Sequence, residues 1–206
     1  MKIDPVHPED AALDEAAGIL SRGGLVVAPT ETRYGLLARV DLQPLLERLY
    51  AVKSRPLDQA TAVMVGGLKE IESLGDLTSM ARVLVERFLP GPLTLVLRAR
   101  WDWPPPRVVD GKIGLRWSSS PVIDGLLRRL DCPLTATSAN ISGRPDPDSV
   151  EEIDSQFGDR VDLYMDAGPL TGPTSTVVDC SERRPRILRD GAIPRAEIES
   201  AIEQMT

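Results

Sequence analysis

The sequence has little of what most enzymes use for proton transfer or metal binding. Its 206 residues include one histidine, His7, and two cysteines, Cys132 and Cys180. His7 lies in a proline-flanked amino-terminal segment, and the cysteines form no CxxC pair and have no histidine nearby. This pattern argues against a zinc site, a disulfide framework and histidine-based acid–base chemistry, and we expect both cysteines to be small buried thiols.

Long apolar runs are also missing. No stretch approaches the roughly 18 apolar residues that suggest a membrane span, and the first residues, MKIDPVHPED, lack the apolar core of a signal peptide. The composition, 42% hydrophobic and 27% charged, is that of an ordinary soluble globular protein. We therefore expect a cytoplasmic protein without a membrane partner, and the length favours a single domain over residues 1–206.

Positive charge and nucleotide-binding fingerprints are scarce as well. The formal net charge is −7, whereas a general nucleic-acid binder needs many Lys and Arg residues to neutralise phosphates. The sequence contains neither GxxxxGK[ST] nor a GxGxxG after a strand, so it is neither a P-loop nor a Rossmann sequence. A phosphate site, if there is one, must be built from local groups of cations, hydroxyls and backbone amides.

What the sequence does contain is an alternation of short helices and strands. Amphipathic spacing predicts helices over residues 8–22, 42–52, 78–89, 121–130 and 149–157 and after Pro194. Short apolar runs predict strands over residues 25–28, 35–40, 61–65, 93–98, 112–117, 134–138, 161–165, 175–179 and 186–189. Because the two kinds of element interleave without strict βαβ regularity, we expect an α/β fold with a twisted, open mixed sheet.

The longest irregular segment is WDWPPPRVVDG, residues 101–111. Its three consecutive prolines predict a stiff, exposed connection. We expect Trp101 and Trp103 to cover an edge of the core rather than to stack on a base.

Polar and cationic residues collect where the predicted strands and helices end. These residues are Thr30, Thr32, Tyr34, Lys53, Arg55, Thr137, Ser138, Asn140, Ser175 and Arg189. Arg116 differs, because it lies within the apolar strand KIGLRW. Strand alternation places Arg116 on the face opposite Leu115, and that face must meet either solvent or a cleft.

Each turn taken alone has an ordinary structural explanation. Hydroxyl and amide side chains cap backbone groups in turns, and cations complement the carboxyl end of a helix. However, the carboxyl ends of strands in an α/β sheet also form the usual ligand crevice. Several such turns in one chain favour a polyanion pocket, in which Lys53, Arg55, Arg116 and Arg189 hold the phosphates of a nucleotide.

Seven segments, in this order, resemble those of the YrdC/YciO family, the threonylcarbamoyl-AMP synthases. They are APTETRYGL at 28–36, KSRP at 53–56, LPGPLTLVL at 89–97, IGLR at 113–116, TSANISG at 137–143, PTSTVVD at 173–179 and ILRDGAI at 187–193. The chain resembles the short form of the family. The resemblance implies an open α/β twist in which the sheet curves around a deep, positively charged cavity.

The resemblance also implies an activity. Family members with an assigned reaction act as nucleotidyltransferases that join L-threonine, bicarbonate and ATP into threonylcarbamoyl-AMP and pyrophosphate. Mg²⁺ would accompany ATP, and no tightly bound cofactor is expected. The product would pass to partner proteins that transfer the threonylcarbamoyl group to tRNA.

By position, the resemblance assigns roles to the polar residues. Thr32 would contact threonine, and Arg116 would hold the carboxylate of the amino acid or of its carbamate. The other assignments are Lys53, Arg55 and Arg189 to phosphates, Ser138 and Asn140 to the nucleotide, Ser175 to the substrate, and Thr30, Tyr34 and Thr137 to the cavity wall. No residue is assigned as a metal ligand.

The sequence departs from the family at four positions. Gln59 stands where a basic residue is usual, Met64 where longer relatives have a histidine, Arg33 where a small or apolar residue is usual, and Trp117 where Pro or Thr is common. These changes keep a second interpretation open, a paralogue that binds a nucleotide with a different acyl substrate or none. A third is a non-enzymatic module that binds tRNA or double-stranded RNA, which the net charge disfavours unless cations gather on one face.

Overall fold

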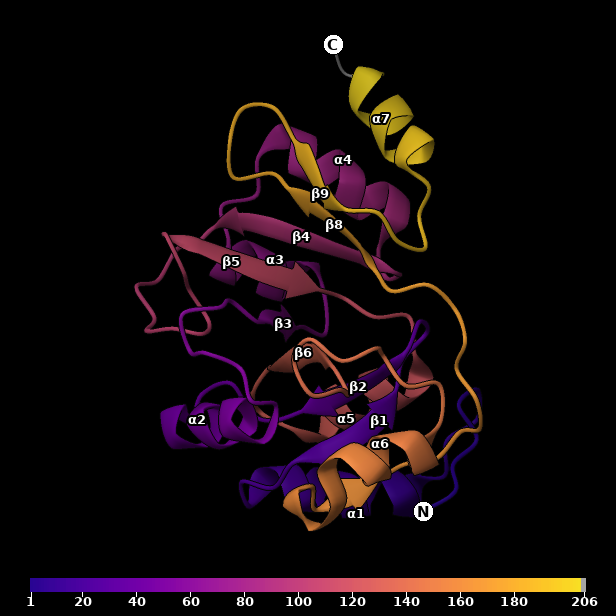
Figure 1. Ribbon diagram of the computed structural model, residues 1–206. Helices are drawn as coiled ribbons and strands as arrows, with labels where there is room; N and C mark the ends of the chain where they lie inside the picture. Colours follow the sequence, from indigo (N-terminus) through magenta and orange to yellow (C-terminus); the bar gives the residue numbers. More distant parts are fainter. Residues whose placement is uncertain (205–206) are drawn as a thin grey trace.

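The computed structural model describes residues 1–204, and its core is one nine-stranded mixed sheet (Figure 1). The spatial order of the strands is β7-β1-β2-β6-β3-β5-β4-β8-β9. Their bounds are β1 Val26–Pro29, β2 Tyr34–Leu37, β3 Ala62–Met64, β4 Leu93–Arg98, β5 Lys112–Arg116, β6 Leu134–Ser138, β7 Leu163–Tyr164, β8 Thr176–Asp179 and β9 Arg186–Arg189. The pairs β1–β7, β3–β5 and β4–β8 are parallel and the others antiparallel. The predicted α/β fold with a mixed sheet is therefore confirmed.

Seven α-helices surround this sheet in the described residues. They are α1 Asp10–Ser21, α2 Gln43–Val52, α3 Leu68–Leu74, α4 Ser79–Phe88, α5 Pro121–Arg129, α6 Val150–Phe157 and α7 Arg195–Glu203. A 3-10 turn, Gly158–Arg160, follows α6. Within residues 1–204, no helix has both the length and the apolar content that a membrane crossing requires.

Local sequence explains where these helices begin and which side they bury. In α1 the buried residues are Leu13, Ala16, Ala17 and Leu20, the spacing of one helical face. Thr78 caps α4 because its hydroxyl accepts a hydrogen bond from the amide of Ala81 at 3.1 Å. Ser149 caps α6 in the same way through the amide of Glu152.

Helices cover both faces of one end of the sheet, which we call the covered half (β7, β1 and β2). Alternate residues of β1 face opposite sides: Val26 and Ala28 pack with α1 and α5, whereas Val27 packs with α2 and α6. Figure 1 shows these four helices gathered at the amino-terminal end of the molecule. This half is a conventional three-layer arrangement with an apolar core on each side.

The remaining strands, β3, β5, β4, β8 and β9, form what we call the open half. The cluster beneath it joins Leu95, Leu115 and Val178 to side chains of α3, α4 and α7, all on one side of the sheet. The opposite face holds Thr94, Gly114, Arg116 and Val177, the residues that alternate with this core. Side chains of α3, α4 and α7 do not reach that face, and its residues line a cavity; Met64 of β3, next to Arg116, also joins the cluster of α1 and α5.

β6 joins the two halves. Its first residues, Leu134–Ala136, pair with β3, and its last, Thr137 and Ser138, pair with β2. The stretch TATSANISG leaves the sheet at this junction, beside the cavity.

Most predicted elements are present, and the differences have physical reasons. Helix α3 was not predicted, because its seven residues bury only Ile71 and Leu74 and its amino terminus has no capping side chain. The strand predicted at 161–165 is reduced to Leu163–Tyr164. The last two residues of the predicted 1–206 domain lie outside the described part of the chain.

The proline-rich connection was predicted to be exposed, and the structure shows that it is exposed only in part. Residues 101–111 contain no helix or strand, and Trp101 is 60% exposed. However, Arg107 and Val108 are buried, and Arg107 lies over the ring of Trp103, 5.3 Å from its centre. Trp103 covers a core edge as expected, whereas Trp101 does not.

The cysteine prediction is confirmed for one thiol and only half met for the other. Cys180 is fully buried, and Cys132 is half-buried against the core. Burial raises the pKa of Cys180 to about 12 and that of Cys132 to about 11. Both thiols are therefore protonated and unreactive at neutral pH.

Candidate functional site

The open face of the sheet forms the floor of a cavity of about 490 Å³. Nine of the eleven predicted site residues line it: Thr30, Thr32, Tyr34, Arg55, Arg116, Thr137, Ser138, Ser175 and Arg189. They come from segments that are far apart in the sequence, so the fold alone brings them together. Of the two alternatives left open for the face of Arg116, solvent or a cleft, the structure shows the cleft.

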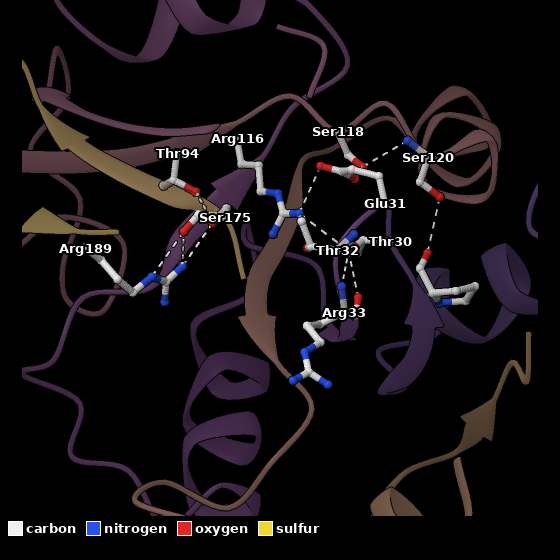
Figure 2. A network of polar contacts seen from close by, with 11 residues as sticks. Thr30, Glu31, Thr32, Arg33, Thr94, Arg116, Ser118, Ser120, Ser175 and Arg189 are labelled. Carbon is white, nitrogen blue, oxygen red and sulfur yellow. Dashed lines mark hydrogen bonds and ion pairs between the residues drawn. The ribbon is translucent and has the colours of Figure 1, made fainter. Parts of the chain in front are cut away.

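Arg116 is the central cation of this cavity (Figure 2). Its Nη2 donates hydrogen bonds to Thr32 Oγ1 at 2.7 Å and to Glu31 Oε1 at 3.0 Å. Its Nε is buried and has no hydrogen-bond partner within residues 1–204. Because this Nε has almost no accessible surface, the donor of Arg116 that is left open to an anion in the cavity is Nη1, which makes no hydrogen bond in the described residues.

The turn between β1 and β2 fixes the residues that meet Arg116. The Thr30 hydroxyl donates to the carbonyl of Arg33 at 2.6 Å and accepts from the amide of Thr32 at 3.1 Å. The Tyr34 hydroxyl donates to the carbonyl of Gly168 at 2.6 Å and accepts from the amide of Ala167 at 2.9 Å. Hydroxyl groups therefore hold the turn rigid and at the same time present oxygen atoms to the cavity.

Arg189 stands on the opposite wall and is held by Ser175. Its Nη2 donates to the Ser175 carbonyl at 2.8 Å and to the Ser175 hydroxyl at 3.0 Å, and that hydroxyl is 3.0 Å from Thr94 Oγ1. Gly191 permits this arrangement, because a Cβ there would lie 2.4 Å from the carbonyl oxygen of Thr174. The glycine in ILRDGAI thus lets β9 approach the PTST segment closely.

Lys53 and Asn140 are the two predicted site residues that do not line the cavity. Lys53 is 2% exposed, and its amine donates to the carbonyls of Ser138 and Asn140 and to the Asn140 side-chain oxygen. The Asn140 amide donates to the carbonyl of Arg144 at 2.7 Å. In this structure both residues brace the TSAN turn, and their predicted contact with a nucleotide stays a prediction.

The remaining predicted phosphate ligand, Arg55, lies between the turn after α2 and the cavity. Its Nη2 donates to the carbonyl of Ala60 at 2.5 Å, and its guanidinium lies over the ring of Tyr50. Its Nε is buried without a partner in the described residues, as in Arg116. Arg55 is therefore held by the protein at Nη2 and at the Tyr50 ring, and its Nη1 is the donor left for a ligand.

The pKa shifts indicate that positive charge in the cavity is not fully balanced. Burial, and secondarily the charge of Arg116, lowers the pKa of Arg189 from its ordinary value. Burial, and secondarily the charge of Arg55, lowers the pKa of Lys53 to about 7. Arg189 and Arg116 both line the cavity, so an anionic ligand between these two would be bound favourably, whereas Lys53 lies outside it.

The far end of the cavity is closed by an ion pair that the sequence did not predict. Lys112 Nζ donates to Asp179 Oδ2 at 2.9 Å, and the Asp179 Oδ1 accepts from the amide and hydroxyl of Ser181. These hydrogen bonds lower the pKa of the Asp179 carboxyl, although burial opposes them. Lys112 could have been found from the alternation in KIGLRW, because it shares the face of Arg116.

The four residues that depart from the family pattern lie in different positions relative to the cavity. Met64 lines the cavity, and so does Arg33, which is also paired with Asp148. Gln59 is exposed, and it is not a lining residue. Trp117 packs against the core on the other face of the sheet, so it does not shape the cavity.

Known proteins resemble this chain in sequence. Residues 18–191 match the Sua5/YciO/YrdC family model, whose description is "Telomere recombination". A threonylcarbamoyl-AMP synthase of Bacillus subtilis is 34% identical over 203 residues, 97% of this chain and 59% of that protein. A relative from Mycobacterium tuberculosis is 37% identical, over 95% of this chain and 92% of its own length. The chain thus spans about three fifths of the first of these relatives and nearly all of the second.

Solved structures show the same fold. The Pyrococcus abyssi Sua5 structure, complexed with L-threonine, superposes with a TM-score of 0.89 at 34% identity and covers 98% of this chain and 61% of that one. The Escherichia coli YciO structure superposes with a TM-score of 0.82 at 27% identity and covers 93% and 95% of the two chains. The match of the family model, the relatives and the fold together establish that this chain belongs to the Sua5/YciO/YrdC family.

Proposed function

We propose that this chain is a threonylcarbamoyl-AMP synthase, which forms threonylcarbamoyl-AMP and pyrophosphate from L-threonine, bicarbonate and ATP. The observation that supports this most is the cavity, where Arg55, Arg116 and Arg189 surround one space together with several hydroxyl groups. Three guanidinium groups suit a substrate set that combines a triphosphate with a carboxylate. The enzyme class, nucleotidyltransferase, is part of the same proposal.

The comparisons favour this function over the paralogue interpretation. The Bacillus subtilis and Pyrococcus abyssi relatives that carry the synthase name are 34% and 35% identical to this chain, whereas the uncharacterised Escherichia coli YciO is 28% identical. The Pyrococcus abyssi protein was also crystallised with L-threonine. An RNA-binding module has no comparable support, and tRNA or double-stranded RNA contact stays a prediction.

The proposed reaction suits side chains that position charge rather than transfer protons. The threonine amine would take up carbon dioxide as a carbamate, whose carboxylate attacks the α-phosphorus and expels pyrophosphate. Arg116 would hold a carboxylate, and Arg55 and Arg189 would neutralise phosphate oxygens. Displacement at phosphorus depends mainly on such positioning and charge neutralisation, which agrees with a site built without histidine.

The residues around the cavity do not fit a magnesium ion held by the protein. Only two carboxylates line the cavity in the described residues, Asp110 and Asp179, and Asp179 is already paired with Lys112. Within residues 1–204, no group of three or more His, Cys, Asp or Glu side chains is arranged to hold a metal. Mg²⁺ would therefore enter as part of the ATP substrate.

We also propose that partner proteins transfer the threonylcarbamoyl group to tRNA and that this takes place in the cytoplasm.

The test is to incubate the purified chain with ATP, Mg²⁺, bicarbonate and L-threonine and to measure pyrophosphate. We expect release that depends on both threonine and bicarbonate and that Arg116→Ala abolishes. ATP binding without threonine-dependent pyrophosphate would contradict the proposal in favour of the paralogue, and binding of double-stranded RNA without ATP binding would favour the RNA module.

A further inference from the structure

Glu31 contacts Arg116 from the side that faces away from the cavity. Its Oε1 accepts from Arg116 Nη2 at 3.0 Å, and its Oε2 accepts from the hydroxyl of Ser118. Figure 2 shows Glu31 and Ser118 on one side of Arg116, and Ser175 and Arg189 on the other. Glu31 and Ser118 are not lining residues of the cavity, so Glu31 reaches a ligand only through Arg116.

A chain of hydrogen bonds ties Glu31 to two parts of the backbone. Ser118 Oγ accepts from the amide of Ser120 at 3.1 Å, and Ser120 Oγ donates to the carbonyl of Pro29 at 3.3 Å. Ser120 directly precedes α5, and Pro29 ends β1. Through Ser118, the Glu31 carboxylate is therefore held against the segment that precedes α5, and Ser120 ties that segment to the end of β1.

The contacts of Arg116 divide its guanidinium into two parts. Nη2 is used by the protein, since it meets Thr32 and Glu31. Nη1, by contrast, makes no hydrogen bond in the described residues and is not a buried atom, so its two donors remain open to a ligand. Both side chains of the pair are mostly buried, 11% exposed for Arg116 and 15% for Glu31, so solvent screens their attraction only weakly.

We propose that Glu31 is a positioning residue that, with Ser118, fixes the orientation of the Arg116 guanidinium so that its free donors face the carboxylate of the substrate. The inference rests on the proposed function, which makes that substrate an amino acid or its carbamate. A free arginine side chain would lose rotamer freedom on binding a ligand. Because Glu31 already orders the Arg116 side chain in the folded protein, this loss of entropy does not occur on binding, and the affinity for the ligand is higher.

The test compares Glu31→Gln with the wild-type full-length chain by calorimetric titration with L-threonine and, separately, with ATP. We expect threonine affinity to fall roughly tenfold, because a charge-assisted hydrogen bond is lost, while ATP affinity changes less than twofold. Ser118→Ala should give a smaller loss, about two- to fivefold, in the same direction. The control is Glu72→Gln, which removes the carboxylate of another Glu–Arg pair, with Arg82, outside the cavity.

A second measurement needs no substrate. The side-chain NMR signals of Arg116, assigned with Arg116→Lys, should show slow rotation of the guanidinium in the wild type and in Glu72→Gln, and fast rotation in Glu31→Gln. A wild-type chain that binds no threonine would overturn the proposed function, but the rotation would still decide the role of Glu31. Unchanged rotation, or equal losses of threonine and ATP affinity together with a lower melting temperature, would overturn the inference.

Discussion

The covered half and the open half of the sheet use the same strand geometry for opposite purposes. In the covered half, both faces of β1 are apolar and buried beneath helices. In the open half, one face of β5 places Ile113 and Leu115 in the core, and the other places Lys112 and Arg116 in the cavity. The cavity exists because α3, α4 and α7 cover only one side of β4, β5 and β8. A residue of these strands therefore contributes to stability or to binding according to the face on which it lies.

The largest expected effect comes from the apolar face of β5. Leu115→Ala removes a fully buried side chain from the core beneath the open half. We expect the free energy of unfolding to fall by about 2–5 kcal/mol, because a cavity remains, while ATP affinity of the folded protein stays unchanged. Urea denaturation and ATP titration measure the two quantities.

The matched substitution on the other face is Leu188→Ala in β9. Leu188 lines the cavity and is 49% exposed. We expect it to cost less than about 1 kcal/mol of stability, because little apolar area is removed from burial. Equal costs at both positions would mean that the two faces do not differ as described.

The second prediction concerns Lys53, a cation buried at the end of α2, beside the covered half. Burial lowers its pKa to about 7 in the folded protein, from an ordinary 10.5. Between these values the unfolded chain binds more protons than the folded one, so this group makes stability rise with pH. The rise from pH 7 to pH 9 should be roughly 2–3 kcal/mol.

Lys53→Met should remove this rise, and urea denaturation at several pH values compares the slopes. The buried cysteines and tyrosines titrate in both proteins and therefore cancel in the difference. Lys69→Met, at an exposed position, is the control and should keep the wild-type slope. A Lys53→Met slope equal to that of the wild type would show that the amine is not destabilised by burial.

The residues of the open half and Lys53 differ in how far their positions could be predicted from the sequence. The alternation in KIGLRW was enough to place Arg116 opposite the core, because strand geometry is local. The position of Lys53 could not be predicted, because its partners are carbonyls of a turn 85 or more residues later in the chain. Glu31 was missed for a similar reason, since a glutamate in a turn is ordinarily solvated and only the fold places Arg116 and Ser118 against it.

The third prediction tests the cation at the rim of the open half. Arg189→Ala should weaken ATP binding by about 1.5–3 kcal/mol, the contribution of hydrogen bonds to a charged group, and should change stability by less than about 1 kcal/mol. Titration with ATP and thermal melting measure these effects. Arg183→Ala is the control, because Arg183 is exposed near the same strand and is not a lining residue. Equal losses in both variants would indicate a nonspecific charge effect.

The smallest expected effect comes from restoring a cation where the family usually has one. Gln59 lies in the turn between α2 and β3, and its carbonyl accepts from the Tyr50 hydroxyl at 2.6 Å, so its backbone is anchored while its side chain is exposed. Gln59→Lys should raise ATP affinity only about two- to fivefold at low salt, roughly 0.5–1 kcal/mol, because an exposed charge is screened. The gain should vanish at high ionic strength. A gain that survives high salt would mean that the new amine enters the cavity. The cavity of the open half would then extend beyond Arg55 to residue 59.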